Sequence, residues 1–263
     1  MPRSPYMRAW TLCLSRRVAS TAMYRSKGQM KAQNPVKPTE FNAIIMSKPT
    51  LTIEILIQEA GLFSEQESLH PEPTIFGVTD GKAIGTYLEH KFQAYLETRY
   101  VHAPGNSASG IDLPGLAVDM KVTSVRQPQS SCPFKNARQK IFGLGYSLLV
   151  FVYEKADDPV NKTAILNILH AIFVESKKTG DFQMTSGLRD ILARNGNEDD
   201  LVAFMQDKML PVEEIEARRI AQELLASAPE LGYLTISNAL QWRLQYSRVI
   251  TQAGAVPGII RIR

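Results

Sequence analysis

Asp112, Asp119 and Lys121 lie close together near the middle of the chain and have the residue types of a metal-dependent phosphodiesterase. Carboxylate oxygens hold hard cations such as magnesium, which keep bound waters, and one such water can become the nucleophile. A lysine beside the scissile phosphate can orient or deprotonate that water, or neutralise charge in the transition state. We therefore predict a nuclease site in which Asp112 and Asp119 bind Mg2+ and Lys121 assists the attack.

The acid-x-lysine tripeptide within this group is not specific by itself, because the sequence contains it four times. Asp80–Lys82 falls at the start of an expected helix, Glu89–Lys91 lies inside that helix, where residues two apart diverge, and Glu175–Lys177 follows a strand with no acid before it. Only Asp119–Lys121 combines strand-like alternation with a preceding acid behind a turn. Strand residues two apart share a face, so both side chains point the same way. The competing interpretation is a surface hairpin with solvated charges.

One helix and two strands must bring these residues together. Asp80 can cap a helix whose apolar residues recur three and four apart over about five turns. A loop rich in Pro, Gly and Ser then opens onto a strand at Ile111, and after a turn at 113–115 the stretch 116–124 alternates like a second strand. We expect these two strands to pair as a hairpin, which would set Asp112 beside Asp119.

The remaining pattern predicts a central mixed β-sheet flanked by helices, in the α/β or α+β class. After the hairpin we expect a helix at 134–142, buried strands at 146–153 and 164–174 with a loop between them, and helices at 186–194, 199–209 and 212–226. We divide the chain into a flexible basic extension (1–45), a catalytic core (46–180) and a helical DNA-contacting C-terminal region (181–263).

These segments together resemble the PD-(D/E)XK nucleases, particularly type II restriction endonucleases. The resemblance covers about a third of the chain, roughly 80–174, and is carried by the runs Gly81–Gly85, Gly110–Asp112, Val118–Lys121 and Leu148–Tyr153. Ile111 stands where the family's eponymous proline would be, a position that commonly varies. The resemblance implies a restriction-endonuclease-like core, Mg2+ held by Asp112 and Asp119, water assistance by Lys121, and a helix glutamate, here Glu89, that completes the site.

The same resemblance implies an enzyme that cuts double-stranded DNA at a specific sequence and leaves 5′-phosphate and 3′-hydroxyl ends. We expect a homodimer, because two strands must be cut and a two-fold protein matches a palindromic site. A type II restriction enzyme is also expected to act in the bacterial cytoplasm and to have a cognate DNA methyltransferase in the same system, without direct contact between the two.

Two segments have the composition of DNA-contacting surfaces. No acid occurs between Asp119 and Glu154, and basic, amide and hydroxyl side chains there can contact phosphates and base edges. The candidates in this stretch are Arg126, Gln127, Gln129, Ser130, Lys135 and Arg138. The acid-free C-terminal stretch adds Gln241, Arg243, Gln245 and Arg248. We favour a helix over 237–252, whereas alternation over 240–247 would instead place Gln241, Arg243 and Gln245 on one face of a strand.

Composition limits the other possibilities. The formal charge of +4 is concentrated in residues 1–39, which hold eight basic residues and no acid, so residues 40–263 carry 22 basic and 26 acidic residues. Whole-chain charge is therefore no argument for DNA binding. No apolar run reaches the roughly 18 residues of a membrane-spanning helix, so we expect no membrane association. The two cysteines, Cys13 and Cys132, form no zinc or redox motif.

Two other functions remain open at this point. A repair or recombination nuclease would recognise DNA structure rather than sequence, and the polar loop at 126–131 favours sequence recognition over it. A non-catalytic DNA-binding protein would leave the acids before Lys121 without a role.

Overall fold

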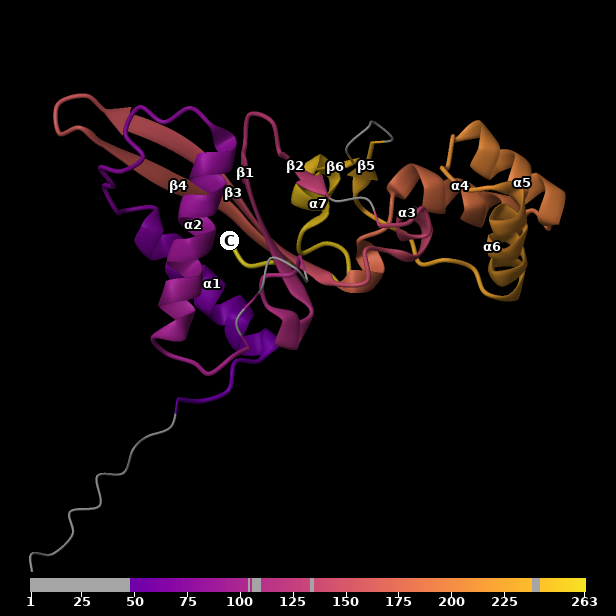
Figure 1. Ribbon diagram of the computed structural model, residues 1–263, viewed down its shortest axis with the longest axis horizontal. Coiled ribbons are helices and arrows are strands. Elements are labelled where there is room, and N and C mark those ends of the chain that lie inside the picture. Colours follow the sequence, from indigo (N-terminus) through magenta and orange to yellow (C-terminus); the bar gives the residue numbers. More distant parts are fainter. Residues whose placement is uncertain (1–47, 104, 106–109, 133–134, 238–241) are drawn as a thin grey trace, which may run out of the picture. The chain divides into compact units, whose positions relative to one another are not determined.

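The computed structural model describes residues 48–103, 105, 110–132, 135–237 and 242–263. Its central sheet has four strands in the order β1-β3-β4-β7. β1 (Val118–Ser124) runs parallel to β3 (Ser147–Asp158), which pairs antiparallel with β4 (Thr163–Val174), and β4 pairs antiparallel with β7 (Ile259–Arg261). This is the mixed sheet that the sequence predicts, flanked by helices (Figure 1).

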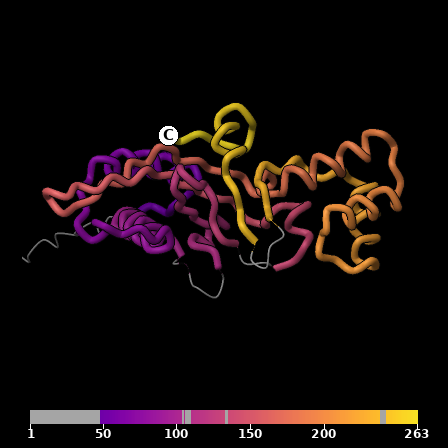
Figure 2. The backbone as a smooth tube through the Cα atoms, turned by 90° about the horizontal axis from the view of Figure 1, so that it is seen from above, coloured from indigo at the N-terminus to yellow at the C-terminus, as the bar shows by residue number. Residues whose placement is uncertain are grey.

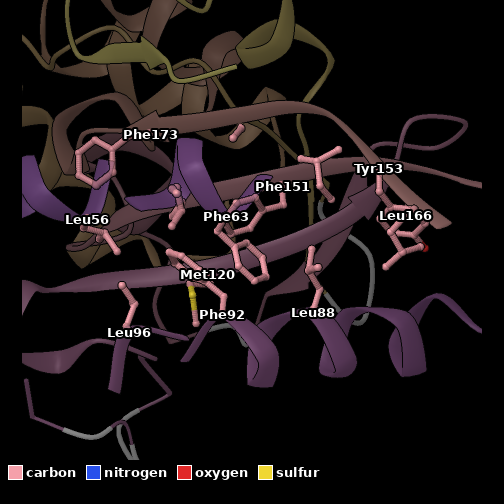
Figure 3. Packing of buried hydrophobic residues seen from close by; sticks show 14 of the residues in the cluster. Leu56, Phe63, Leu88, Phe92, Leu96, Met120, Phe151, Tyr153, Leu166 and Phe173 are labelled. Carbon is pink, nitrogen blue, oxygen red and sulfur yellow. The ribbon is translucent and has the colours of Figure 1, made fainter. Parts of the chain in front are cut away.

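Helices α1 (Ile53–Glu67) and α2 (Gly81–Glu97) pack on one face of this sheet, α1 against β4 and α2 against β1. The Asp80 carboxylate caps α2 by accepting hydrogen bonds from the amides of Lys82 and Ala83. One stripe of α2, formed by Ile84, Leu88, Phe92 and Leu96, is fully buried. Figure 3 shows Phe92 of α2 close to Phe63 and Phe151, with Met120 of β1 beside them.

The opposite face of the central sheet has a second core, which includes a small sheet of order β2-β6-β5. β2 (Gln129–Cys132) pairs antiparallel with β6 (Trp242–Gln245), and β6 with β5 (Thr235–Ile236). The short helix α7 (Ser247–Gln252) follows β6 and contributes Val249 to the same core.

A third hydrophobic cluster holds the remaining helices together. α4 (Phe182–Ala193), α5 (Glu198–Asp207) and α6 (Glu214–Ala226) pack on one another (Figure 2). Ile141 of α3 (Gln139–Phe142) belongs to this cluster. All three helices expected between 186 and 226 are present, with bounds shifted by a few residues. No helix in the described part of the chain is long and apolar enough to cross a membrane.

The expected hairpin before β1 is reduced to one antiparallel bridge. Leu113 and Val118 exchange both backbone hydrogen bonds, and the 3-10 helix η1 (Pro114–Leu116) fills the turn between them. Ala117 has a left-handed backbone with φ of 52°. The turn predicted at 113–115 is therefore correct, but a paired strand ending at Asp112 is not, because among the described residues this segment pairs with β1 through the Leu113–Val118 bridge alone.

Two expected helices are wrong in part. Within 134–142 only 139–142 is helical, because the preceding described residues form a turn and Gly143, at φ of 86°, ends the helix at once. The helix favoured over 237–252 is confirmed only for α7, because Trp242–Gln245 is the strand β6. There Trp242 and Leu244 are buried while Arg243 and Gln245 are exposed, the alternation of the competing strand interpretation.

The stability of α2 against the sheet should depend on Phe92. We expect Phe92→Ala to lower the free energy of unfolding by about 3–5 kcal/mol, because a fully buried ring in contact with two others leaves a cavity. Urea unfolding followed by circular dichroism measures the loss. Leu69→Ala, at a side chain that is 81% exposed, is the control and should change stability by no more than about 0.5 kcal/mol. Equal, small effects for both variants would contradict this packing.

Candidate active site

Strand β1 places Asp119 and Lys121 on the same face, as their spacing predicts. The parallel register sets Asp119 opposite Leu148 and Lys121 opposite Val150. The Lys121 Nζ atom lies 2.7 Å from Oδ2 of Asp119, and the Asp119 side chain is almost fully buried. The intervening Met120 points the other way, into the core beneath α2. The strand thus holds a buried carboxylate and an amine together at one end of the apolar core.

Asp112 reaches the same place from the turn before β1. Its Oδ2 atom accepts a hydrogen bond of 2.8 Å from the backbone amide of Met120, the residue between Asp119 and Lys121. The Leu113–Val118 bridge fixes the backbone next to it. The tight turn therefore does what a longer hairpin was expected to do, since it returns the chain so that Asp112 and Asp119 lie together.

Glu89 joins these residues from helix α2. A cavity of about 360 Å³ is lined by Glu89, Asp112, Asp119 and Lys121, together with Gln93, Ile111 and two glycines. The helix glutamate, whose orientation the sequence could not settle, therefore faces the strand residues. The structure brings all four sequence-predicted catalytic candidates to one cavity.

Burial and like charge shift the pKa values of two acids in this cavity. Burial raises the pKa of Asp119 to about 7, the Lys121 ammonium opposes the rise, and the neighbouring Asp112 adds to it. Burial, followed by the charge of Asp112, also raises the pKa of Glu89 to about 7. For Lys121 burial works against the charge, but Asp119, Asp112 and Glu89 outweigh it and raise the pKa of the amine. Three carboxyl groups thus lie around one amine, and the raised pKa values of Asp119 and Glu89 reflect the cost of keeping these buried acids ionised side by side.

This donor set fits a hard divalent cation. Asp112 and Asp119 offer carboxylate oxygens, and a bound cation would relieve the repulsion that raises the pKa of Asp119. Among the described residues no group of three or more His, Cys, Asp or Glu side chains is arranged to hold a metal ion unaided. Such a cation would therefore complete its coordination with water, backbone carbonyls or substrate, as magnesium commonly does.

A larger cavity of about 770 Å³ adjoins the first and shares Glu89 and Lys121 with it. Four residues of the predicted DNA surface line this cavity, namely Gln127, Gln129, Ser130 and Arg243. The first turns of α2 form another part of its wall through Gly81, Lys82, Gly85 and Thr86. Polar side chains from β2 and β6 therefore lie next to the acidic cavity, although residues 129 and 243 are far apart in sequence.

The other predicted DNA contacts lie elsewhere. Arg126 and Lys135 are exposed and do not line the large cavity, whereas Gln245 is exposed on β6 opposite Gln129. Arg138 is ion-paired with Glu216 and Glu223 of α6, and the Arg248 guanidinium stacks on the Phe182 ring at 3.5 Å. Gln241 falls outside the described residues.

Some residues that line the large cavity were not among the sequence candidates. Lys82 belongs to the Gly81–Gly85 run that carried the family resemblance, and Thr86 directly follows that run, so their place in the first turns of the helix capped by Asp80 was the available signal. Ser131 and Thr123 also line it. Thr123 continues the two-residue spacing of Asp119 and Lys121, which was the signal for that residue.

Comparison with known proteins decides the family. The family model described as type II restriction enzyme NspV matches residues 50–261, most of the chain. The chain belongs to the NspV family of type II restriction enzymes. A curated member, the type II restriction enzyme NspV of a Nostoc species, is 65% identical over 212 residues, which are 81% of this chain and 96% of that protein. No solved structure matches this NspV-family chain.

Family membership confirms the nuclease class predicted from the sequence. The NspV-family enzyme is a sequence-specific endonuclease, a type II site-specific deoxyribonuclease, and DNA is its substrate. The alternatives of a structure-specific repair nuclease and a non-catalytic DNA-binding protein are thereby set aside. Type II restriction enzymes use a divalent metal, which agrees with the carboxylate donors of the small cavity.

The raised pKa of Glu89 gives the metal-free NspV-family enzyme a specific pH dependence. Because the folded pKa, about 7, exceeds the ordinary value of 4.5, the native state holds this proton more tightly than the unfolded chain. Its contribution to stability is present at low pH and is lost as the pH rises through about 7. Glu89→Gln removes that loss, so the variant should gain stability over the wild type between pH 5 and pH 8.

Urea unfolding in EDTA at the two pH values measures this gain. Glu65→Gln, at an exposed position of α1, is the matched control and should differ from the wild type equally at both pH values. If Glu89→Gln also shows the same difference from the wild type at pH 5 and pH 8, the assigned environment of Glu89 is wrong.

Proposed function

We propose that this NspV-family enzyme hydrolyses phosphodiester bonds of double-stranded DNA with Mg2+ held by Asp112 and Asp119. The observation that carries the proposal is the shared wall of two cavities: the one lined by the acids and Lys121 opens beside the one lined by Gln and Arg side chains. When bound, the metal would polarise a phosphate oxygen and lower the pKa of a bound water. The side chains described next orient the phosphate and that water.

Lys121 is the proposed partner of the reacting phosphate. The carboxyl groups of Asp119, Asp112 and Glu89 raise the pKa of its amine and so keep it protonated. Its side chain lines both cavities. A fixed ammonium at this position neutralises the charge that develops on the phosphate oxygens and orients the attacking water. Asp119 holds Nζ at 2.7 Å and so restricts the lysine to one direction. Glu89 faces the same space from α2 and is proposed to complete the site as its third acid.

The proposed DNA-reading surface combines Gln127, Gln129, Ser130, Arg243 and the neighbouring Gln245. Amide and guanidinium groups can bond to base edges in the major groove, and strands of a β-sheet can carry them there. Here β2 and β6, neighbouring strands of the three-stranded sheet β2-β6-β5, form the proposed reading ribbon, with Gln129 opposite Gln245. The exposed Arg126 and Lys135 are proposed to contact phosphates.

We also propose a homodimer that cuts both strands of a palindromic site in the bacterial cytoplasm, with a cognate methyltransferase that protects the same site. The support is the requirement for two cuts and the two-fold symmetry of such sites.

Asp119 and Lys121 are tested together. We expect Asp119→Asn to abolish detectable plasmid cleavage in Mg2+ while DNA binding in Ca2+ persists, because one metal ligand is lost and the reading surface is intact. Lys121→Ala should lower kcat by roughly 10²–10⁴-fold, the size of a positioned charge or proton-transfer group. Gel assays of cleavage and of binding separate the two effects.

The sequence supplies matched controls in another acid-x-lysine tripeptide. Glu175→Gln and Lys177→Ala change exposed side chains outside both cavities. They should cleave like the wild type. Full cleavage by Asp119→Asn, or equal loss in the control variants, would contradict the proposed site.

Arg243 is tested by its effect on affinity and base discrimination. Arg243→Ala should weaken binding to the recognition site by about 1–3 kcal/mol and relax the preference for one base pair, because a bidentate contact to a base is lost. Fluorescence anisotropy with duplexes altered one base pair at a time measures both quantities. Arg138→Ala removes the same side chain where it is paired with α6, and should leave binding unchanged. Uniform weakening across all duplexes for Arg243→Ala would show a phosphate contact instead.

A further inference from the structure

Thr123 is a buried polar residue on the catalytic strand that the proposed chemistry does not use. It is 4% exposed and follows Asp119 and Lys121 at the same two-residue spacing, so its side chain lies on their face of β1. It belongs to the wall of the large cavity. Its hydroxyl forms hydrogen bonds with the backbone of the segment 127–129, which carries two of the proposed reading residues.

Those hydrogen bonds bind Thr123 to both ends of a three-residue segment. The Oγ1 atom accepts from the amide of Gln129 at 2.9 Å, and its own proton is within reach of the carbonyl oxygens of Gln129 at 3.0 Å and Gln127 at 3.2 Å. The amide of Gln129 also donates to the carbonyl of Gln127 at 2.8 Å. One side chain of the cutting strand thus fixes the backbone of two glutamines that line the reading cavity.

The same segment is held from its other side by the C-terminal part of the chain. The amide of Tyr246 donates to the carbonyl of Pro128 at 2.9 Å, and the Tyr246 hydroxyl lies 2.5 Å from Oγ of Ser130. Tyr246 is fully buried and follows directly after β6. Residues 127–130 are therefore hydrogen-bonded to Thr123 of β1 on one side and to Tyr246, directly after β6, on the other. Thr123 connects this segment to the strand that carries Lys121.

We propose that Thr123 is a positioning residue that determines sequence specificity: its hydroxyl fixes the backbone position of Gln127 and Gln129, and so the direction of their side chains, relative to Lys121. This inference rests on the proposed DNA-reading role of the two glutamines. Base recognition by side-chain amides needs placement within about 0.5 Å, which a backbone free to shift does not give. Removal of the hydroxyl leaves the Gln129 amide and a carbonyl with poorer partners, so the loop relaxes while Asp119 and Lys121 stay fixed by β3.

The experiment compares Thr123→Val, which keeps the shape but loses the hydroxyl, with Thr123→Ser, which keeps the hydroxyl. The recognition site is first defined by digesting a randomised DNA library with the wild-type enzyme in Mg2+ and sequencing the ends of the DNA products. The ratio of kcat/KM at that site to kcat/KM at sites altered by one base pair then measures discrimination. We expect the ratio to fall about tenfold in Thr123→Val, mainly because altered sites are cut faster, and to return to the wild-type value in Thr123→Ser.

Thr185→Val is the matched control for stability. Thr185 is also fully buried, and its hydroxyl accepts from the Gly232 amide at 2.9 Å and donates to the Asp181 carbonyl at 2.7 Å, remote from both cavities. The Thr185→Val variant should lower the melting temperature as Thr123→Val does, and it should leave discrimination between DNA sites unchanged. If Thr123→Val does not fold, Thr123→Ala takes its place in the same comparison.

The outcomes separate the inference from the function on which it rests. A wild-type protein that cuts no DNA with any divalent metal overturns the proposed function. A wild type that cuts specifically, with unchanged discrimination in the hydroxyl-free variant, overturns only the role of Thr123. Loss of discrimination that is equal in Thr185→Val, or that Thr123→Ser does not restore, also overturns it, because either result reflects general destabilisation.

Discussion

The parallel pairing of β1 with β3 is the constraint on which the site depends. This register gives β1 two distinct faces: Val118 and Met120 pack beneath α2, and Asp119, Lys121 and Thr123 lie on the opposite face. A slip by one residue would exchange the faces and turn both charged side chains into the apolar core beneath α2. The hydrophobic core against α2 therefore does more than stabilise the fold, because it also fixes the direction of the residues that are proposed to do the chemistry.

Electrostatics explains why such a site can exist within a stable protein. Glu89, Asp112 and Asp119 crowd around one lysine, and burial together with like charge raises the pKa of Asp119 and of Glu89. This arrangement is unfavourable for folding without a cation, whereas a divalent metal converts the same repulsion into binding energy. Local rules of stability are commonly broken at functional sites and offset elsewhere. Here the offset comes from the buried stripe of α2 and the aromatic contacts beneath the strand.

The proposed cutting and reading surfaces meet because distant segments converge on β1. The turn before the strand supplies Asp112, helix α2 supplies Glu89, and the ribbon of β2 and β6 supplies glutamine and arginine side chains. Helices α4 to α6 line neither cavity, and their arginines are largely engaged with acids of the same helices, as the Arg218 pairs show. Specificity in this protein is thus proposed to depend on how the ribbon is held against the catalytic strand, rather than on the helical bundle.

The sequence by itself determined the features that follow from local periodicity and residue chemistry. The buried strands, the stripe of α2, the helices between 186 and 226, and the shared face of Asp119 and Lys121 were all predictable, because spacing along one strand or helix sets which side chains share a face. Only the tertiary structure decided that Glu89 faces the acids, that Arg138 pairs with α6, and that Trp242–Gln245 is a strand paired with β2. These features depend on contacts between segments tens to over a hundred residues apart, and short-range patterns carry no information about which distant partner a face will meet.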